Sequence, residues 1–330
     1  MPPANDHPTN RLMPLVSICI PAYNAEPFIA ETLESAISQD YPRTEIIVSD
    51  DASTDRTPEI IKNFESQGVR LLRQKKNLKL ARNINAAIEA SSGKYICRVD
   101  ADDLLEPNFI SSMVPVMEQS PSIAFAHCAC RLIDVNGKPF GFHRSIHGSF
   151  IRSGLQEWSR YVFGLKAVNI LMIRRSTFEA VGGYDARFNY TEDWKMARDL
   201  LAIGDVFYND QVLASYRVHA VGKKGVRLLQ AREHLLQLED MEQNWLAAVP
   251  HKEELLSQAR RLLAWSLVSS AAFVDAEEAR QVLEFLPQYG NFLGPRLLAR
   301  FIQNGGSSFY QVYCHLKTML RQRIKKLLYK

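Results

Sequence analysis

The first hundred residues alternate short apolar runs with amphipathic helical patterns. The apolar runs are rich in β-branched residues, and the helical patterns repeat apolar residues three or four positions apart. The predicted strands are residues 15–20, 45–49, 69–73 and 95–99, and the predicted helices begin at Pro27, Thr57 and Ala81. Strands that alternate with helices of about ten residues form βαβ units around a parallel sheet. We therefore expect an α/β fold with a mainly parallel, Rossmann-like sheet flanked by helices.

The pattern changes in the middle of the chain and becomes purely helical after Val226. Further strands are predicted at residues 123–135, 168–173 and 212–218, with a hairpin turn at Asn136-Gly137 and a helix from Thr191 to Gly204. These signals predict a domain organisation of three parts. The parts are a flexible N-terminus over residues 1–14, a sheet domain over 15–222 with halves at 15–103 and 104–222, and an α-helical C-terminal region over 226–330.

Polar and aromatic side chains gather where the predicted parallel strands end. The residues at these ends are Pro21, Ala22, Tyr23 and Asn24 after the first strand, Asp50 and Asp51 after the second, and Asp100 and Asp102 after the fourth. In open α/β sheets, ligands bind in the crevice at the carboxyl ends of the strands. We therefore expect an aromatic ring and several carboxylates around one crevice.

Asp100 and Asp102 are candidates for a divalent cation site. In an extended segment, residues two positions apart point the same way. Two carboxylates that face one crevice repel each other unless a cation lies between them. Hard oxygen ligands with an incomplete shell suit Mg²⁺ or Mn²⁺ completed by substrate phosphates. The alternative is a solvated acidic loop, because a D-x-D triplet alone is a weak signal.

The other strand-end candidates also have a functional and a structural interpretation. Asp50 and Asp51 offer acceptors for the N–H of a nucleobase or for ribose hydroxyls, or they shape a strand-end turn. Tyr23 is placed to stack on a flat base, or it is a half-buried rim residue. Both interpretations stay open at this point.

Two candidates lie in the second half of the sheet domain. Glu192 and Asp193 occupy the first turn of a predicted helix, where the helix dipole favours ionised carboxylates. The functional interpretation makes one of them a general base that is directed at the crevice. His219 follows the last predicted strand and is either a ligand of a metal or phosphate, or a polar strand-end residue.

Composition narrows the class of protein. The chain has 330 residues, 46% of them apolar and 23% charged, which is ordinary for a globular protein of about two domains. The five cysteines are odd in number and lie mostly in apolar strand-like runs, as is typical of reduced thiols in the cytoplasm. We expect neither a secretory signal nor a membrane-spanning helix. Basic residues do not interleave with aromatic ones over the first domain, so we expect no nucleic-acid partner.

The net charge of +4 is unevenly distributed. After Glu284 the chain has eight lysines and arginines and no acidic residue. Within residues 309–330, leucines and an isoleucine recur at helical spacing among these basic residues. A basic amphipathic helix of this kind binds an anionic membrane surface, or it packs on the catalytic domain or forms a homodimer contact. The first alternative predicts a peripheral protein at the inner face of the plasma membrane.

Five segments together resemble the glycosyltransferase family 2 enzymes of the GT-A fold. They are VSICIPAYNAEPFIAETLESAISQDYP, EIIVSDDASTDRTPEII, KKNLKLARNINAAIEASSGKYICRVDADD, GGYDARFNYTEDWKMARDLLAIG and SYRVH, in the order of the family, from about Leu15 to His219. The resemblance implies an inverting, metal-dependent transfer of sugar from a nucleotide-sugar donor, a UDP-sugar, to a hydroxyl of a glycan or lipid-linked acceptor. It also implies a role in cell-surface polysaccharide or glycolipid biosynthesis, with the nucleotide-binding half at 15–103 and the acceptor half at 104–222.

The resemblance implies a role for each candidate residue. Asp193 would be the catalytic base, with Glu192 beside it contacting the acceptor. Asp102 would bind Mn²⁺ or Mg²⁺, and His219 would complete the metal shell or order the loop over the diphosphate. The nucleotide-binding residues would be Pro21, Ala22, Tyr23, Asn24, Asp50, Asp51, Arg82 and Asp100. Lys79 departs from the family, which often has glycine there, so this loop is expected to have a different shape.

Two other functions are weighed beside this one. A catalytically silent sugar-nucleotide-binding protein would bind the donor without turnover or metal dependence. A sugar nucleotidyltransferase should carry a glycine-rich loop with Arg and Lys after the first strand, where this chain has the segment from Pro21 to Asn24. The sequence therefore favours the transferase over the nucleotidyltransferase.

Overall fold

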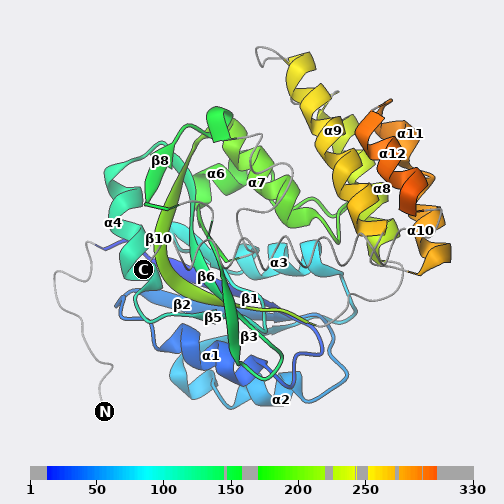
Figure 1. The fold of residues 1–330 in the computed structure, drawn as a ribbon. Coiled ribbons are helices and arrows are strands. Elements are labelled where there is room, and N and C mark those ends of the chain that lie inside the picture. The colour runs from blue at the N-terminus through cyan, green and yellow to red at the C-terminus, as the bar shows by residue number, and fades with distance from the viewer. Residues whose placement is uncertain are drawn as a thin grey trace. The chain divides into compact units, whose positions relative to one another are not determined.

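The structure is a computed structural model that forms two compact units, Met1–Ala220 and Val221–Lys330. The residues that it describes are 13–144, 147–157, 170–219, 226–241, 243, 252–271, 275–291 and 293–302. The first unit contains the sheet, and the second consists of helices (Figure 1).

A ten-stranded sheet forms the centre of the first unit. Its strands are β1 (Val16–Ala22), β2 (Thr44–Asp50), β3 (Val69–Arg73), β4 (Tyr95–Arg98), β5 (Leu104–Leu105), β6 (Ile123–Ile133), β7 (Pro139–His143), β8 (Phe150–Arg152), β9 (Leu171–Arg174) and β10 (Asp205–Arg217). Their order is β3-β2-β1-β4-β9-β6-β10-β5, with β7 paired to β6 and β8 to β10. The expected hairpin at Asn136-Gly137 is confirmed, since β6 and β7 are antiparallel neighbours.

Strand direction decides where the polar strand ends meet. β1 pairs in parallel with β2 and β4, and β2 pairs in parallel with β3. β9 runs antiparallel to both β4 and β6, so β6 has the direction of β4, and β10 is parallel to β6. These six strands therefore end at the same edge, and the predicted mainly parallel α/β fold is confirmed.

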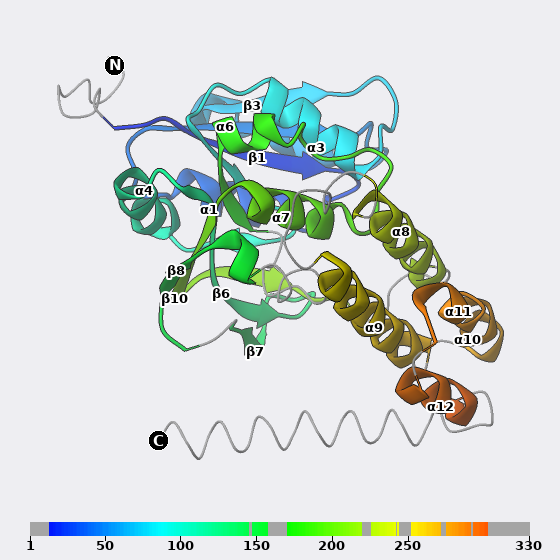
Figure 2. The same cartoon turned by 90° about the horizontal axis from the view of Figure 1, so that it is seen from above.

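Helices cover both faces of this sheet. They are α1 (Ile29–Ile37), α2 (Thr57–Lys62), α3 (Leu80–Glu89), α4 (Phe109–Gln119), α6 (Arg175–Ala180) and α7 (Glu192–Ile203), with a 3₁₀ turn at Glu65–Gln67. α1 and α2 lie on one face, and α3, α6 and α7 lie on the other, which faces the viewer in Figure 2. Ile18, Ile20 and Val48 of the sheet pack with Ile29 and Leu33 of α1 in one buried core. Each such side chain stabilises the fold by about 1.5–3 kcal/mol.

The second unit is helical in the part that the structure describes. Its helices are α8 (Val226–Asp240), α9 (Lys252–Ala271), α10 (Ala276–Leu283), α11 (Leu286–Tyr289) and α12 (Leu293–Phe301). Leu267, Val282 and Tyr289 are buried in its core, and Asp275 caps α10 by accepting a hydrogen bond from the Glu278 N–H at 2.8 Å. The predicted amphipathic helix over 309–330 lies outside the described residues. Among the described helices, none is both long and apolar enough to cross a bilayer.

Candidate active site

A cleft of about 290 Å³ opens at the carboxyl ends of β1 and β2. It is lined by Pro21, Ala22, Tyr23, Asp51, Asn77, Lys79, Leu80 and Asn83. Tyr23 is half exposed at this cleft. The Asp51 carboxylate accepts hydrogen bonds from the backbone N–H of Leu78 at 2.6 Å and of Lys79 at 3.1 Å. These bonds hold the loop before α3 against the strand ends.

Backbone strain is concentrated around this cleft. Among the described non-glycine residues, Asn24, Ala52 and Lys79 have positive φ values of 48°, 58° and 72°. Asn24 is held by two bonds, since its N–H donates to Ser53 Oγ at 2.9 Å and its Oδ1 accepts the N–H of Thr54 at 2.9 Å. Lys79 combines its φ with a ψ of 162°, a region that is normally restricted to glycine. Lys79, at the position where a glycine was expected from the family resemblance, therefore keeps a glycine-like backbone conformation.

The structure separates the two aspartates at the end of β2. Asp50 is completely buried, where its Oδ1 accepts the Ser53 N–H at 3.3 Å and its Oδ2 lies 3.5 Å from Arg73 Nε. Asp51 is also buried, with 3% of its surface exposed, but it lines the cleft. Of the pair, only Asp51 is among the lining residues. Arg82 is exposed on α3 and is not among the residues that line the cleft.

A buried arginine joins Asp100 to Glu192. Arg98 at the end of β4 is completely buried, and its Nη2 lies 3.1 Å from Asp100 Oδ1 and 3.2 Å from Glu192 Oε1. Its guanidinium also lies over the ring of Tyr184, 5.1 Å from the centroid. Because Glu192 opens α7, this arginine connects the segment after β4 to the start of α7. Glu192 is only 3% exposed.

The Asp102 carboxylate contacts His219, whereas the Asp100 carboxylate contacts Arg98. The expectation that Asp100 and Asp102 lie in an extended segment is wrong, because β4 ends at Arg98 and residues 101–102 form a turn closed by a 3.1 Å bond from the Asp103 N–H to the Asp100 carbonyl. Asp102 Oδ2 lies 2.6 Å from His219 Nε2, and both side chains are partly exposed. The pair thus presents one carboxylate and one imidazole to solvent.

Arg217, which the sequence analysis did not single out, fixes this turn. The Arg217 N–H donates to Asp103 Oδ1 at 2.8 Å, and its Nε donates to the Asp102 carbonyl at 2.9 Å. Its Nη2 reaches Glu31 Oε2 at 2.8 Å, and the guanidinium lies over the ring of Phe28. The end of β10 is therefore tied to the turn that carries Asp102. An arginine two positions before the strand-end histidine was the only sequence signal for this role.

Crowded carboxylates give this edge its electrostatic character. Burial, reinforced by Asp100, raises the pKa of Asp102. Burial also raises the pKa of Glu192, which Arg98 opposes. Asp193, at the start of α7 and almost fully buried, has its pKa raised to about 8 by burial and by the charge of Glu192. A cation bound at this edge would lower all three pKa values, because it stabilises the charged forms.

The comparisons with known proteins agree with this architecture. The family model described as Glycosyl transferase family 2 matches residues 17–182, half of the chain. The chain therefore belongs to glycosyltransferase family 2, and it is an enzyme of the glycosyltransferase class. It is 26% identical over 257 residues to an uncharacterized glycosyltransferase of Rickettsia prowazekii, covering 75% of this chain and 76% of that protein.

Two further similarities concern a longer relative and a solved structure. The hyaluronan synthase of Pasteurella multocida is 26% identical over 240 residues, which is 71% of this chain but only 24% of the synthase. The crystal structure of residues 1–349 of S. aureus TarS in complex with UDP-GlcNAc has a TM-score of 0.66 at 17% identity, and the match covers 83% of this chain and 80% of that 1–349 chain. At that identity the similarity shows the GT-A type fold alone.

A second solved structure is that of the mannosyltransferase PcManGT from Pyrobaculum calidifontis, in complex with GDP-Man and Mn²⁺. It has a TM-score of 0.54 at 18% identity and covers 92% of this chain and 87% of the mannosyltransferase. Proteins with this fold therefore bind nucleotide sugars with different bases.

Proposed function

We propose that residues 15–222 form the catalytic domain of an inverting, divalent-cation-dependent glycosyltransferase. It would move a sugar from a UDP-sugar to a hydroxyl of a glycan or lipid-linked acceptor in cell-surface polysaccharide or glycolipid biosynthesis, at the cytoplasmic face of the membrane. The observation that carries the proposal is the placement of Asp51, Asp102 and Asp193 at the ends of β2, β4 and the start of α7, on one edge of the sheet. Relatives named as hyaluronan and chondroitin synthases support the substrate class.

The cleft at β1 and β2 suits the nucleotide. The exposed face of Tyr23 can stack on a flat base, and a base N–H can donate to the Asp51 carboxylate. The backbone of Pro21 and Ala22 forms the wall beside them, and Asn24 shapes the rim through its bonds to the 53–54 loop. Asp100 would hold the ribose side. Stacking tolerates any base, so the hydrogen bond to Asp51 would supply the preference for uracil.

The donor set at the end of β4 fits a divalent cation. Asp102 and His219 would be its two protein ligands, since Asp102 Oδ2 lies 2.6 Å from His219 Nε2 and both side chains are partly exposed. Among the described residues, no group of three or more His, Cys, Asp or Glu side chains is placed to hold a metal. Mg²⁺ and Mn²⁺ commonly take one or two protein ligands and complete their shell with substrate phosphates and water. When bound, the cation would neutralise negative charge on the leaving diphosphate.

The chemistry then depends on Asp193. An acceptor oxygen would attack the anomeric carbon while the bond to the nucleoside diphosphate breaks on the opposite face, which inverts the configuration. Asp193 would take the hydroxyl proton on its carboxylate as the new bond forms. Its raised pKa makes the carboxylate a stronger base than an exposed aspartate once it is ionised. Glu192, paired with Arg98, would orient this end of α7 toward the acceptor.

The test combines donor binding with turnover. Thermal unfolding of the full chain is measured with UDP-, GDP- and other nucleotide sugars, with and without Mn²⁺, and turnover is then followed as release of nucleoside diphosphate. We expect a UDP-sugar to raise the melting temperature only with the metal present. Asp102→Asn and Asp193→Asn should each lower turnover by about 100-fold or more, since each removes a group that acts on the reacting atoms.

A matched variant and two outcomes decide the result. Asp205→Asn changes an aspartate at the amino end of β10, on the opposite edge of the sheet, and should keep turnover. Full turnover by Asp193→Asn would remove the base assignment. Donor binding without metal dependence and without turnover would instead establish a silent sugar-nucleotide-binding protein.

A further inference from the structure

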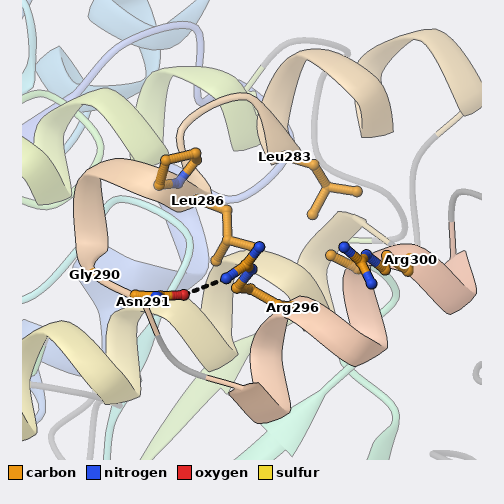
Figure 3. A pocket seen from close by; sticks show the side chains of 8 residues that line it. Leu283, Leu286, Gly290, Asn291, Arg296 and Arg300 are labelled. Carbon is orange, nitrogen blue, oxygen red and sulfur yellow. Dashed lines mark hydrogen bonds between the residues drawn. The ribbon is translucent and has the colours of Figure 1, made fainter.

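A second cavity lies within the helical unit. It has a volume of about 380 Å³ and is lined by Leu283, Leu286, Pro287, Gly290, Asn291, Arg296, Ala299 and Arg300 (Figure 3). Leu283, Leu286 and Ala299 are buried, so the inner wall is apolar. Arg296 and Arg300 are exposed and stand one helical turn apart on α12. The cavity therefore joins an apolar interior to a cationic mouth.

The charge at this mouth is not balanced by lining residues. None of the described residues that line the cavity has a carboxylate. The sequence has no Asp or Glu after Glu284, whereas it has eight Lys and Arg residues there. Arg296 Nη1 donates a hydrogen bond to Asn291 Oδ1, which orients the guanidinium without neutralising it (Figure 3). Two guanidinium groups in this arrangement are suited to an anion such as a phosphate.

An exposed leucine on the same helix indicates whether that anion is a free ion or part of a lipid. Leu293 is 73% exposed, the largest exposed fraction of any large apolar side chain in the described part of the chain. Leu293, Arg296 and Arg300 are three and seven positions apart, so they share one face of α12. On such a face the long arginine side chains keep their guanidinium groups at the level of lipid headgroups while the leucine side chain reaches the apolar layer beneath them.

We propose that this cavity binds the phosphate headgroup of an anionic phospholipid. Arg296 and Arg300 hold the phosphate oxygens, the glycerol and the first methylene groups lie against Leu286 and Leu283, and Leu293 enters the acyl region. The occupant is a lipid rather than a free phosphate, because the apolar wall and Leu293 have no function toward a soluble anion. The inference does not depend on the transferase activity, since the site lies in the other unit.

Binding of monomeric short-chain lipids to the full chain tests the site. Dihexanoyl phosphatidylglycerol should bind, and dihexanoyl phosphatidylcholine and inorganic phosphate should bind much more weakly, by titration calorimetry. The double variant R296Q/R300Q should weaken phosphatidylglycerol binding about 10-fold or more, since each basic side chain contributes to the attraction. The variant R296K/R300K, which keeps the charge, should retain more of the affinity than the glutamine variant.

The control separates this cavity from the rest of the basic surface. R261Q/R280Q removes the same charge from exposed positions of α9 and α10 outside the cavity and should leave binding unchanged. Equal losses in both double variants, or inorganic phosphate binding as tightly as the lipid, would overturn the proposal. Thermal unfolding of each variant shows that the fold is retained.

Leu293 has its own readout. In sedimentation with phosphatidylglycerol vesicles, Leu293→Gln should lower the bound fraction. Leu236→Gln, a similar change at a leucine of α8 that is 45% exposed, should not. Equal binding of the two variants would remove Leu293 from the site.

Discussion

At the scale of single residues, buried arginines organise the site more than the exposed acids do. Arg98 holds Asp100 and Glu192 together, and Arg217 fixes the turn that carries Asp102. A buried charge is tolerated only when it is paired and hydrogen-bonded, so each arginine commits its carboxylate partners to one position. Arg98 therefore orients the carboxylates of Asp100 and Glu192, and Arg217 orients the backbone that carries Asp102.

Replacing Arg98 with methionine should change both stability and the pH dependence of turnover. Loss of one member of a buried pair costs about 3–5 kcal/mol of unfolding free energy. Because Arg98 also lowers the pKa values of Glu192 and Asp193, its removal should shift the acid limb of the kcat/KM profile to higher pH. For the unchanged protein, that limb should lie above the ordinary range of an aspartate and no higher than about pH 8.

Arg174 provides the comparison for this prediction. It is also buried, but its guanidinium donates to the backbone carbonyls of Ile123, Met117 and Ser120 and not to the catalytic carboxylates. Arg174→Met should therefore destabilise the fold and leave the acid limb in place. Arg98→Lys should restore part of the shift. An unchanged pH profile in Arg98→Met would show that Arg98 has only a structural role.

At the scale of elements, the loop between β3 and α3 reaches the end of β2 through a backbone conformation that a lysine side chain does not favour. The loop into α3 bends at Lys79, and two N–H groups of this bend donate to Asp51. Asn83 then fastens α3 to β2, because its Nδ2 donates to the Ser49 carbonyl at 2.8 Å. The cleft keeps its shape because hydrogen bonds hold a strained loop in place.

Lys79→Gly should stabilise the protein. A non-glycine residue in this conformation costs about 1–3 kcal/mol, and glycine removes most of that cost but adds entropy to the unfolded chain. We expect the unfolding free energy in urea to rise by about 1 kcal/mol. Lys76→Gly, in the same loop but without a positive φ, should give no gain. A loss of stability in Lys79→Gly would contradict the strain.

At the scale of the whole molecule, buried titratable groups make stability depend on pH. Asp193 has a raised pKa in the folded state, so folding is favoured when it is protonated, and this contribution is lost as pH rises toward about 8. His127 and His234 are buried, and their pKa values are lowered to about 3 and about 4. Their contribution to the unfolding free energy is present above the ordinary pKa of histidine and is lost as pH falls below it.

These two sets of groups act in different pH windows. Above about pH 7.5 these histidines bind almost no proton in either state, whereas folded Asp193 still loses its proton up to about pH 8, so the unfolding free energy should fall with pH there because of Asp193. Denaturation in urea at several pH values measures the slope. Asp193→Asn should flatten it, whereas Asp205→Asn should not. A slope of the opposite sign would contradict the raised pKa.

The sequence determined the fold class and the edge where the site lies. Apolar periodicity and β-branched runs fix strand and helix, and parallel strands must end together, so Tyr23, Asp51 and Asp102 could be assigned to one edge from their positions after strands. The pairing of Asp102 with His219 and of Glu192 with Arg98 was decided only by the tertiary structure, because 117 and 94 positions separate the partners along the chain. Local pattern carries information over a few residues, while burial and charge pairing depend on which distant segments pack together. Only the tertiary structure decided the burial of Asp50, the anchoring of the turn by Arg217 and the cavity beside Arg296 and Arg300.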